Sequence, residues 1–312
     1  MKKIIIPVLI LLLLTGYTPY VEVNDLVIVD MLGLEKVDDD YILTVNTIKE
    51  EKDDNATKST YQAVTFKGKS LGKVFLEAKK IETKKAYYGH LKLMVFKEGL
   101  LDKELINFLQ KEFKEMNYLI IGTDSNIKEL FNKYDSSSKI IKAVNKEKIS
   151  NADIYLATFE DYLKDIVNKK RASTLPVVSL NNNNLVVKGL ETYQKNILLD
   201  RKQAKITYLL NNKITSFHQS IKLNDKYYEV EFNNVKVLYQ QDKINLLMDI
   251  KCSDDATGKK TKELKTVVQE LFTKEIEELL TFQDDKGIKL VLLSNKKPDI
   301  KVKLMIGDGR YD

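Results

Sequence analysis

The sequence predicts an α+β protein in two parts, each built from mixed or antiparallel strands with packed helices. Residues 228–232, 235–239 and 244–252 alternate apolar and polar side chains, the period of half-buried antiparallel strands. Residues 264–280 carry a wide apolar stripe at helical spacing, which predicts one long amphipathic helix covering the second sheet. The first half of the chain mixes strand-like runs with shorter helical patterns.

The folded part is expected to begin with three strands. Residues 26–34 and 41–48 form apolar, β-branched runs on either side of Asp38-Asp39-Asp40, a pattern that predicts a hairpin around an acidic turn. Residues 50–58 are expected to form a charged loop, and residues 61–66 a third strand closed by Gly68.

Helices and single strands are expected to follow in turn. Ser70 is expected to cap a helix whose apolar side chains share one face, and Asp102 a second helix over residues 105–113. Strands are expected over residues 87–96 and 118–121, a third helix over 127–134 and a polar stretch from Ser136. Thr158 and Asp161 have capping-box spacing for a fourth helix. The face of the first helix comprises Leu71, Val74, Phe75, Ala78 and Ile81.

A domain boundary is expected at residue 172, where a basic segment ends before Leu175-Pro176-Val177 resumes an extended chain. This divides the protein into residues 1–20, 21–172 and 173–312. In the last part, a strand is expected at residues 185–187 and a strand–turn–strand over 205–214, around Asn211-Asn212. After the long helix, strands are expected over residues 288–293 and 300–306.

Residues 1–20 have the layout of a secretory signal or membrane anchor. Two lysines precede an apolar run over residues 4–14, which is shorter than the roughly 20 residues needed to cross a bilayer. Leu14-Thr15-Gly16 matches the end of a lipoprotein signal, but Tyr17 stands where the lipid-bearing Cys would be. No lipid-attachment residue is therefore assigned. The alternatives are an uncleaved anchor, a released chain, or a chain that has lost its Cys.

Composition narrows the class of partner. The formal net charge is +6, and about +4 without Lys2 and Lys3 (6 − 2). Basic and acidic residues are mixed along the chain, with no basic stripe interleaved with aromatics, so we expect no nucleic-acid partner. Cys252 is the only cysteine, which excludes an internal disulfide and a multi-cysteine zinc site.

No residue set predicts catalysis, a cofactor or a metal. His90 and His218 lack nucleophile partners and are interpreted as structural, and Cys252 follows the apolar face of its strand as a small hydrophobe. Gly68-Lys69-Ser70 ends like a phosphate loop, but Ala63 stands where the first glycine is required, so no nucleotide is expected. The acidic pairs lack the spacing of a calcium loop. We therefore expect a protein that is not an enzyme.

Taken in order, several short motifs resemble the Ger(x)C family, the C subunits of spore germinant receptors. Tyr17 and the following Thr18-Pro19 depart from that pattern, as does the stretch between the long helix and the last strand, which is short and has no tryptophan. The similar segments are residues 24–29, Leu32-Gly33-Leu34, residues 41–45, Gly68-Lys69-Ser70 with Phe75 and Ala78, Gly89-His90-Leu91-Lys92, Leu175-Pro176-Val177 and the strand–long helix–strand ending.

The resemblance implies a non-catalytic subunit at the outer face of the spore inner membrane, either peripheral or anchored by its N-terminal segment. Its partners would be the A-type and B-type membrane subunits and the membrane surface, in a complex that triggers germination. His90 would then be a structural strand residue. One alternative is an exported solute-binding protein acting alone, although such proteins usually have alternating parallel strands. Another is a secreted hydrolase, which the missing nucleophile and metal sets disfavour.

Overall fold

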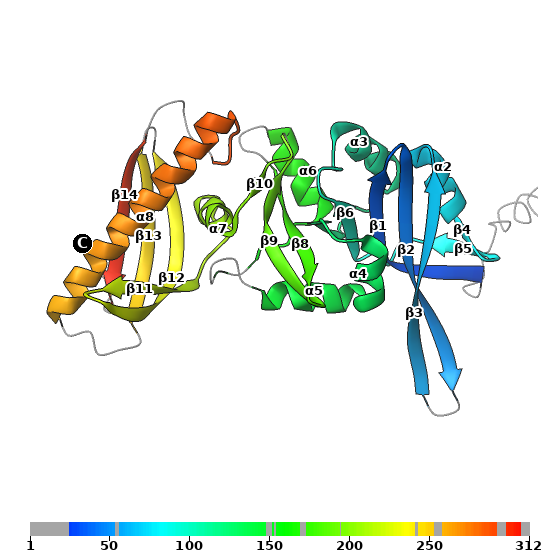
Figure 1. Ribbon diagram of the computed structural model, residues 1–312, viewed down its shortest axis with the longest axis horizontal. Coiled ribbons are helices and arrows are strands. Elements are labelled where there is room, and N and C mark those ends of the chain that lie inside the picture. The colour runs from blue at the N-terminus through cyan, green and yellow to red at the C-terminus, as the bar shows by residue number, and fades with distance from the viewer. Residues whose placement is uncertain are drawn as a thin grey trace, which may run out of the picture.

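The protein is an elongated assembly of two sheets, seen side by side in the computed structural model (Figure 1). The structure describes residues 25–306 apart from 54–55, 148–151, 153, 169–172, 194, 241–242, 253–257 and 292–297. Sheet A has ten strands and sheet B has four, with helices packed on both. The α+β expectation is confirmed, and both sheets are mixed rather than purely antiparallel.

Sheet A has the strand order β10-β9-β8-β7-β6-β1-β2-β3, with β5 also pairing β1 and β4 pairing β5. The neighbours β1, β6, β7 and β8 run parallel, and antiparallel strands flank them. The strands are β1 (Leu26–Val37), β2 (Asp40–Asp53), β3 (Ala56–Gly68), β4 (Lys80–Ile81), β5 (Lys84–Tyr87), β6 (Leu93–Lys97), β7 (Leu119–Thr123), β8 (Thr174–Asn181), β9 (Asn184–Thr192) and β10 (Leu198–Leu199).

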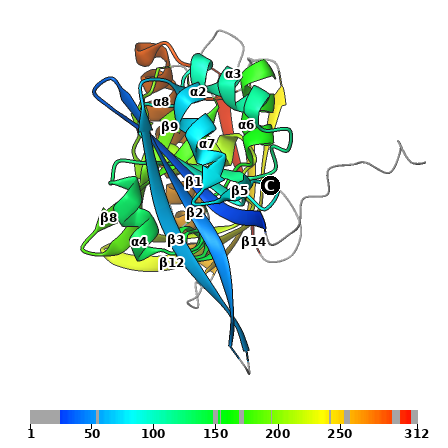
Figure 2. The same cartoon turned by 90° about the vertical axis from the view of Figure 1, so that its right-hand side faces the viewer.

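The predicted hairpin is formed by β1 and β2, which pair from Val37 and Asp40 outward. Asp38 takes a positive φ of 53° in the turn, a conformation that Asp tolerates better than most residues. The expected charged loop over residues 50–58 is wrong, because β2 continues to Asp53 and β3 begins at Ala56. The two strands extend past β1 as a ribbon (Figure 2).

Helices cover both faces of sheet A, and their apolar side chains fill two separate buried clusters. On one face lie α2 (Leu71–Ala78), α3 (Lys103–Glu112) and α6 (Phe159–Asn168), and on the other lie α4 (Ile127–Lys133) and α5 (Ser137–Lys146). The predicted caps are present: Ser70 Oγ accepts from Lys73 N, and Asp102 Oδ1 accepts from Leu105 N. The helix α5 lies where only a polar stretch was expected.

Helix α5 begins without a capping side chain from its own N-cap, Ser136. Asp30, in the middle of β1, supplies the missing acceptor. Its two carboxylate oxygens accept from the Ser137 backbone N–H at 2.6 Å and from Ser137 Oγ at 2.8 Å. The carboxylate is buried, so these bonds compensate its desolvation and fix α5 against the sheet.

Sheet B has the order β11-β12-β13-β14, with β11 (Phe217–Leu223), β12 (Lys226–Gln240), β13 (Lys243–Cys252) and β14 (Asp299–Ile306). The predicted long helix is α8 (Gly258–Lys286), which crosses one face of this sheet (Figure 1). It links β13 to β14, which run parallel, as expected for a β–α–β crossover. Residues 288–291 of the expected strand 288–293 are not in a strand, and 292–293 lie outside the described residues.

The expected strand–turn–strand over residues 205–214 is wrong. The chain instead forms α7 (Arg201–Leu210), opened by a capping box between Asp200 and Gln203. Every residue from Ala204 to Leu210 is buried, so no polar face marks the sequence as helical. The helix lies between the two sheets (Figure 1) and packs against β9, β12 and α8.

The expected boundary at residue 172 lies among residues that the structure does not describe. Beyond it, β8, β9 and β10 join sheet A through the parallel pairing of β8 with β7. Sheet B begins only at Phe217, after α7. Residues 174–199 therefore contribute strands to sheet A, and the domain boundary at residue 172 stays a prediction.

Candidate functional site

The four parallel strands of sheet A end at a common edge, the place where open α/β sheets commonly bind ligands. Charged side chains from β1, β6 and β9 and from the loops after β6 and β7 lie near it. We call this group the charged edge; it comprises Glu35, Lys97, Glu98, Asp124, Lys188 and Glu191. Its geometry determines whether the edge can receive a ligand.

Three of these six side chains form ion pairs with one another. Lys188 Nζ lies 2.7 Å from Asp124 Oδ2 and 3.9 Å from Glu98 Oε2. Lys97 Nζ donates to the carbonyl oxygens of Asp124 and Ser125, the latter at 3.2 Å. Burial raises the pKa of Asp124, but hydrogen bonds from Lys188 and serine side chains lower it overall. The pairs hold the loops after β6 and β7 to β9.

Glu191 is the most unusual member of the charged edge. Its residue is only 3% exposed, and its Oε1 accepts one hydrogen bond, of 2.8 Å, from the Gly99 backbone N–H. Burial raises the pKa of Glu191 to about 7, an effect that the Gly99 bond opposes and the charge of Glu98 increases. Asn196 Nδ2 donates to the Gly99 carbonyl, so β9 and the segment before β10 both hold the β6–α3 turn.

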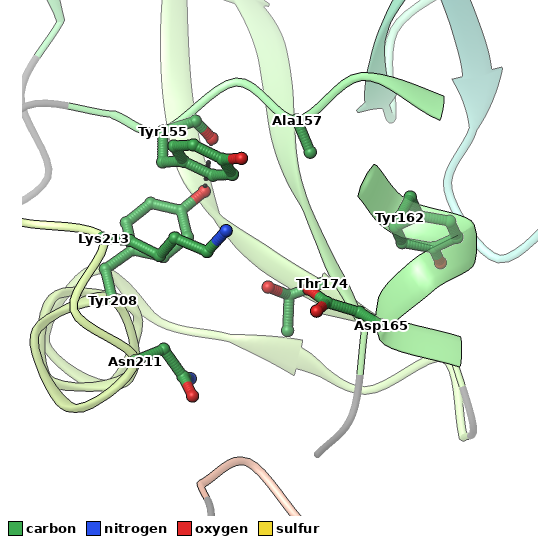
Figure 3. Close-up of a pocket in the computed structure, with 8 residues that line it drawn as sticks. All are labelled: Tyr155, Ala157, Tyr162, Asp165, Thr174, Tyr208, Asn211 and Lys213. Carbon is green, nitrogen blue, oxygen red and sulfur yellow. Dashed lines mark hydrogen bonds between the residues drawn. The ribbon is translucent and has the colours of Figure 1, made fainter. Parts of the chain in front are cut away.

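A small cleft lies where α6 and β8 face α7 (Figure 3). Its volume of about 20 Å³ is enough for about one water molecule. Tyr208 donates from its hydroxyl to the Tyr155 carbonyl at 2.9 Å, and Lys213 Nζ lies 3.9 Å from the centre of the Tyr155 ring. The remaining lining residues are Ala157, Tyr162, Asp165, Thr174 and Asn211. The cleft is a packed joint between elements and is too small for an organic ligand.

A second joint lies between α7, α8 and sheet B. Lys205 Nζ is 3.3 Å from Glu275 Oε2 and 3.0 Å from Gln219 Oε1, and both charged residues are buried. The ammonium also lies 5.3 Å from the Phe272 ring centre. Burial lowers the pKa of Lys205 despite the neighbouring carboxylate. These contacts fix α7 to the helix and the edge strand of sheet B.

The residues considered for chemistry from sequence do not come together. His90 lies exposed in the turn before β6, not in a strand as the family resemblance implied, and its ring meets the Tyr87 ring at 5.7 Å. His218 is exposed on β11, and Cys252 packs partly buried against the core. Tyr17 lies outside the described residues.

The remaining motifs have structural surroundings. Ser70 caps α2, and Gly68 closes β3 beneath it. Asp40 in the first acidic turn pairs with Lys67 and Lys69 at 3.1 and 2.9 Å. Asp54 and the Asp254-Asp255 pair lie outside the described residues. Within the described ranges, no three His, Cys, Asp or Glu side chains are arranged to hold a metal ion.

Among the described helices, none has the length and apolar character required to cross a bilayer. Sequence reasoning missed both Glu191 and Lys205. For Lys205 a signal was present: it is a single charge within the otherwise uncharged segment from Gln203 to Asn212. For Glu191 the sequence offers no comparable signal, because its partner is a backbone amide on a distant turn.

The described residues thus form ion pairs at the charged edge, a cleft with room for about one water, and buried polar contacts that hold the elements together. Residues 19–180 match the spore germination protein N-terminal domain family, and the chain belongs to this Ger(x)C family of spore germination proteins. The fold is similar to that in a crystal structure of the GerBC protein, with a TM-score of 0.51 and 12% identity, covering 88% of this chain and 95% of that chain. No curated protein matches the sequence.

Proposed function

We propose that this protein is the non-catalytic C subunit of a spore nutrient germinant receptor. It would be exported, lie at the outer face of the inner membrane, and contribute to the assembly and signalling that trigger germination. The observation that carries the proposal is the family match over residues 19–180, joined to a fold shared with the GerBC protein along nearly the whole chain.

The geometry of the described residues supports a binding role. The charged edge, where a ligand would bind in many α/β proteins, is occupied by its own ion pairs. The cleft beside α7 has room for about one water. Both features favour a subunit that acts through its outer surfaces, with A-type and B-type membrane subunits as partners.

Co-purification tests the proposal. A C-terminal tag would be added to the chain, spore inner membranes solubilised in mild detergent, and the recovered proteins identified. We expect two larger membrane subunits in amounts equal to the tagged chain, with Tyr17 left unchanged. Recovery of the chain alone from the soluble fraction would refute both the receptor assignment and the membrane location.

A further inference from the structure

The chain emerges from its N-terminal segment beside a basic hairpin. Strand β1 begins at Leu26 and pairs in parallel with β5, so that Leu26 lies opposite Lys85. Strand β4 pairs antiparallel with β5, with Lys80 opposite Lys85. Figure 1 shows β4, β5 and the start of β1 at one end of the molecule, with sheet B at the other. We call Lys80, Lys84 and Lys85 the basic hairpin.

These three lysines are exposed, and within the described part of the chain none of them forms an ion pair. The neighbouring charges are already matched: Lys79 lies 3.0 Å from Glu112, and Glu82 lies 3.0 Å from Lys49. Asp25 is exposed one residue before the Leu26–Lys85 pair and offsets one positive charge. A net positive charge therefore remains at the point where the chain enters the fold.

An exposed aromatic corner adjoins the hairpin. Tyr87 ends β5 with 43% of its surface exposed, and its ring meets that of the exposed His90. Gly89 allows this arrangement, because a Cβ there would lie 2.4 Å from the Tyr87 hydroxyl oxygen. Tyrosine favours the interface between headgroups and water, since its ring is apolar and its hydroxyl is polar.

We propose that the basic hairpin and Tyr87 form the surface with which this protein contacts the anionic headgroups of the membrane. The inference rests on the proposed function, which places the protein at the outer face of the inner membrane. Ten residues separate the apolar run over 4–14 from Asp25, so that run is joined by at most about 35 Å of chain to the strand that begins opposite Lys85 of β5. Each lysine at an anionic surface strengthens binding by about fivefold, within a Debye length of roughly 8–10 Å.

The absence of tryptophan from the sequence makes a site-specific test available. Full-length Tyr87→Trp would be reconstituted with vesicles of equal parts phosphatidylglycerol and phosphatidylcholine that carry a headgroup-level nitroxide lipid. Tyr227→Trp is the matched control, because Tyr227 is 69% exposed on sheet B at the opposite end of the molecule. We expect quenching of the tryptophan at position 87 and no quenching at position 227.

Charge removal provides a second readout. The variant K80Q/K84Q/K85Q should reduce the preference of the full chain for phosphatidylglycerol over phosphatidylcholine vesicles by about tenfold or more. The control K243Q/K251Q/K303Q removes the same charge from exposed lysines of sheet B and should change that preference by less than about threefold. Equal effects of the two variants would overturn the assignment of this surface.

The two proposals fail in different ways. A chain that binds neither type of vesicle would refute the membrane location itself. A chain that binds both but shows equal quenching at positions 87 and 227, or quenching only at 227, would refute the membrane-facing hairpin alone. In that case an acidic protein surface would be the better occupant for the three lysines.

Discussion

Replacing Glu191 by glutamine should remove a large part of the pH dependence of stability. The buried carboxyl has its pKa raised from 4.5 to about 7, so the folded state binds its proton more tightly than the unfolded chain does. The stabilisation from this proton is complete below about pH 4.5 and is lost as the pH rises through about 7. At about 1.36 kcal/mol per pKa unit, the loss amounts to about 3 kcal/mol of unfolding free energy.

Glu191→Gln keeps an oxygen that can accept from the Gly99 N–H, but it carries no proton that is lost near neutral pH. Urea unfolding of the full chain in mild detergent at about pH 5 and pH 8 would measure the difference. Because part of the stabilisation is already lost at pH 5, we expect the wild type to lose about 2–3 kcal/mol more than the variant between these conditions. Glu270→Gln is the control, since Glu270 is exposed on α8 and is not among the charges that act on Glu191. Equal pH slopes for the wild type and Glu191→Gln would refute the reasoning.

Three further predictions concern packing, each measured by urea unfolding against the wild type. Lys205→Met should lower the free energy of unfolding by about 3–5 kcal/mol, because it leaves the buried Glu275 carboxylate unpaired. The double variant K205M/E275L should be within about 1 kcal/mol of the wild type, and a double variant as unstable as the single one would contradict this. Gly189→Ala should lower the free energy of unfolding by about 3 kcal/mol or more, because its Cβ would lie 1.8 Å from a β10 carbonyl oxygen. The control Gly72→Ala, on the open face of α2, should be neutral or stabilising. Asp30→Ala should cost about 2–3 kcal/mol by leaving the first turn of α5 without its acceptor, and a loss below about 0.5 kcal/mol would show that the cap is dispensable.

The features predicted correctly from sequence are those whose cause is local. The caps of α2 and α3 depend on a side chain and a backbone amide three residues apart, so Ser70 and Asp102 identify them directly. The strands of sheet B alternate because one face is covered by α8 and the other meets water. In each case the sequence neighbours of a residue determine its structure.

The features that sequence reasoning missed have non-local causes. Helix α7 is enclosed by β9, β12 and α8, so its buried run has no polar face and reads like a strand. Helix α5 begins at a cap supplied by Asp30, over a hundred positions earlier in the chain. The sheet to which β8–β10 belong depends on pairing with β7, which no pattern within residues 174–199 records. The partners of Glu191 and Lys205 were hidden for the same reason.

Sheet A and sheet B share one apolar core, so the quenching experiment at positions 87 and 227 reports the orientation of the whole molecule at the membrane. A single buried cluster runs from Met31 in β1 through the apolar side chains of α7 to Leu304 in β14. Close-packed interiors deform little, so the two ends of such a body keep their relative positions. If the basic hairpin faces the membrane, sheet B must then lie at the end of the molecule that is farther from the membrane. The Lys205–Glu275 joint strengthens this connection, because it fixes α7 to α8 at the point where the two sheets meet.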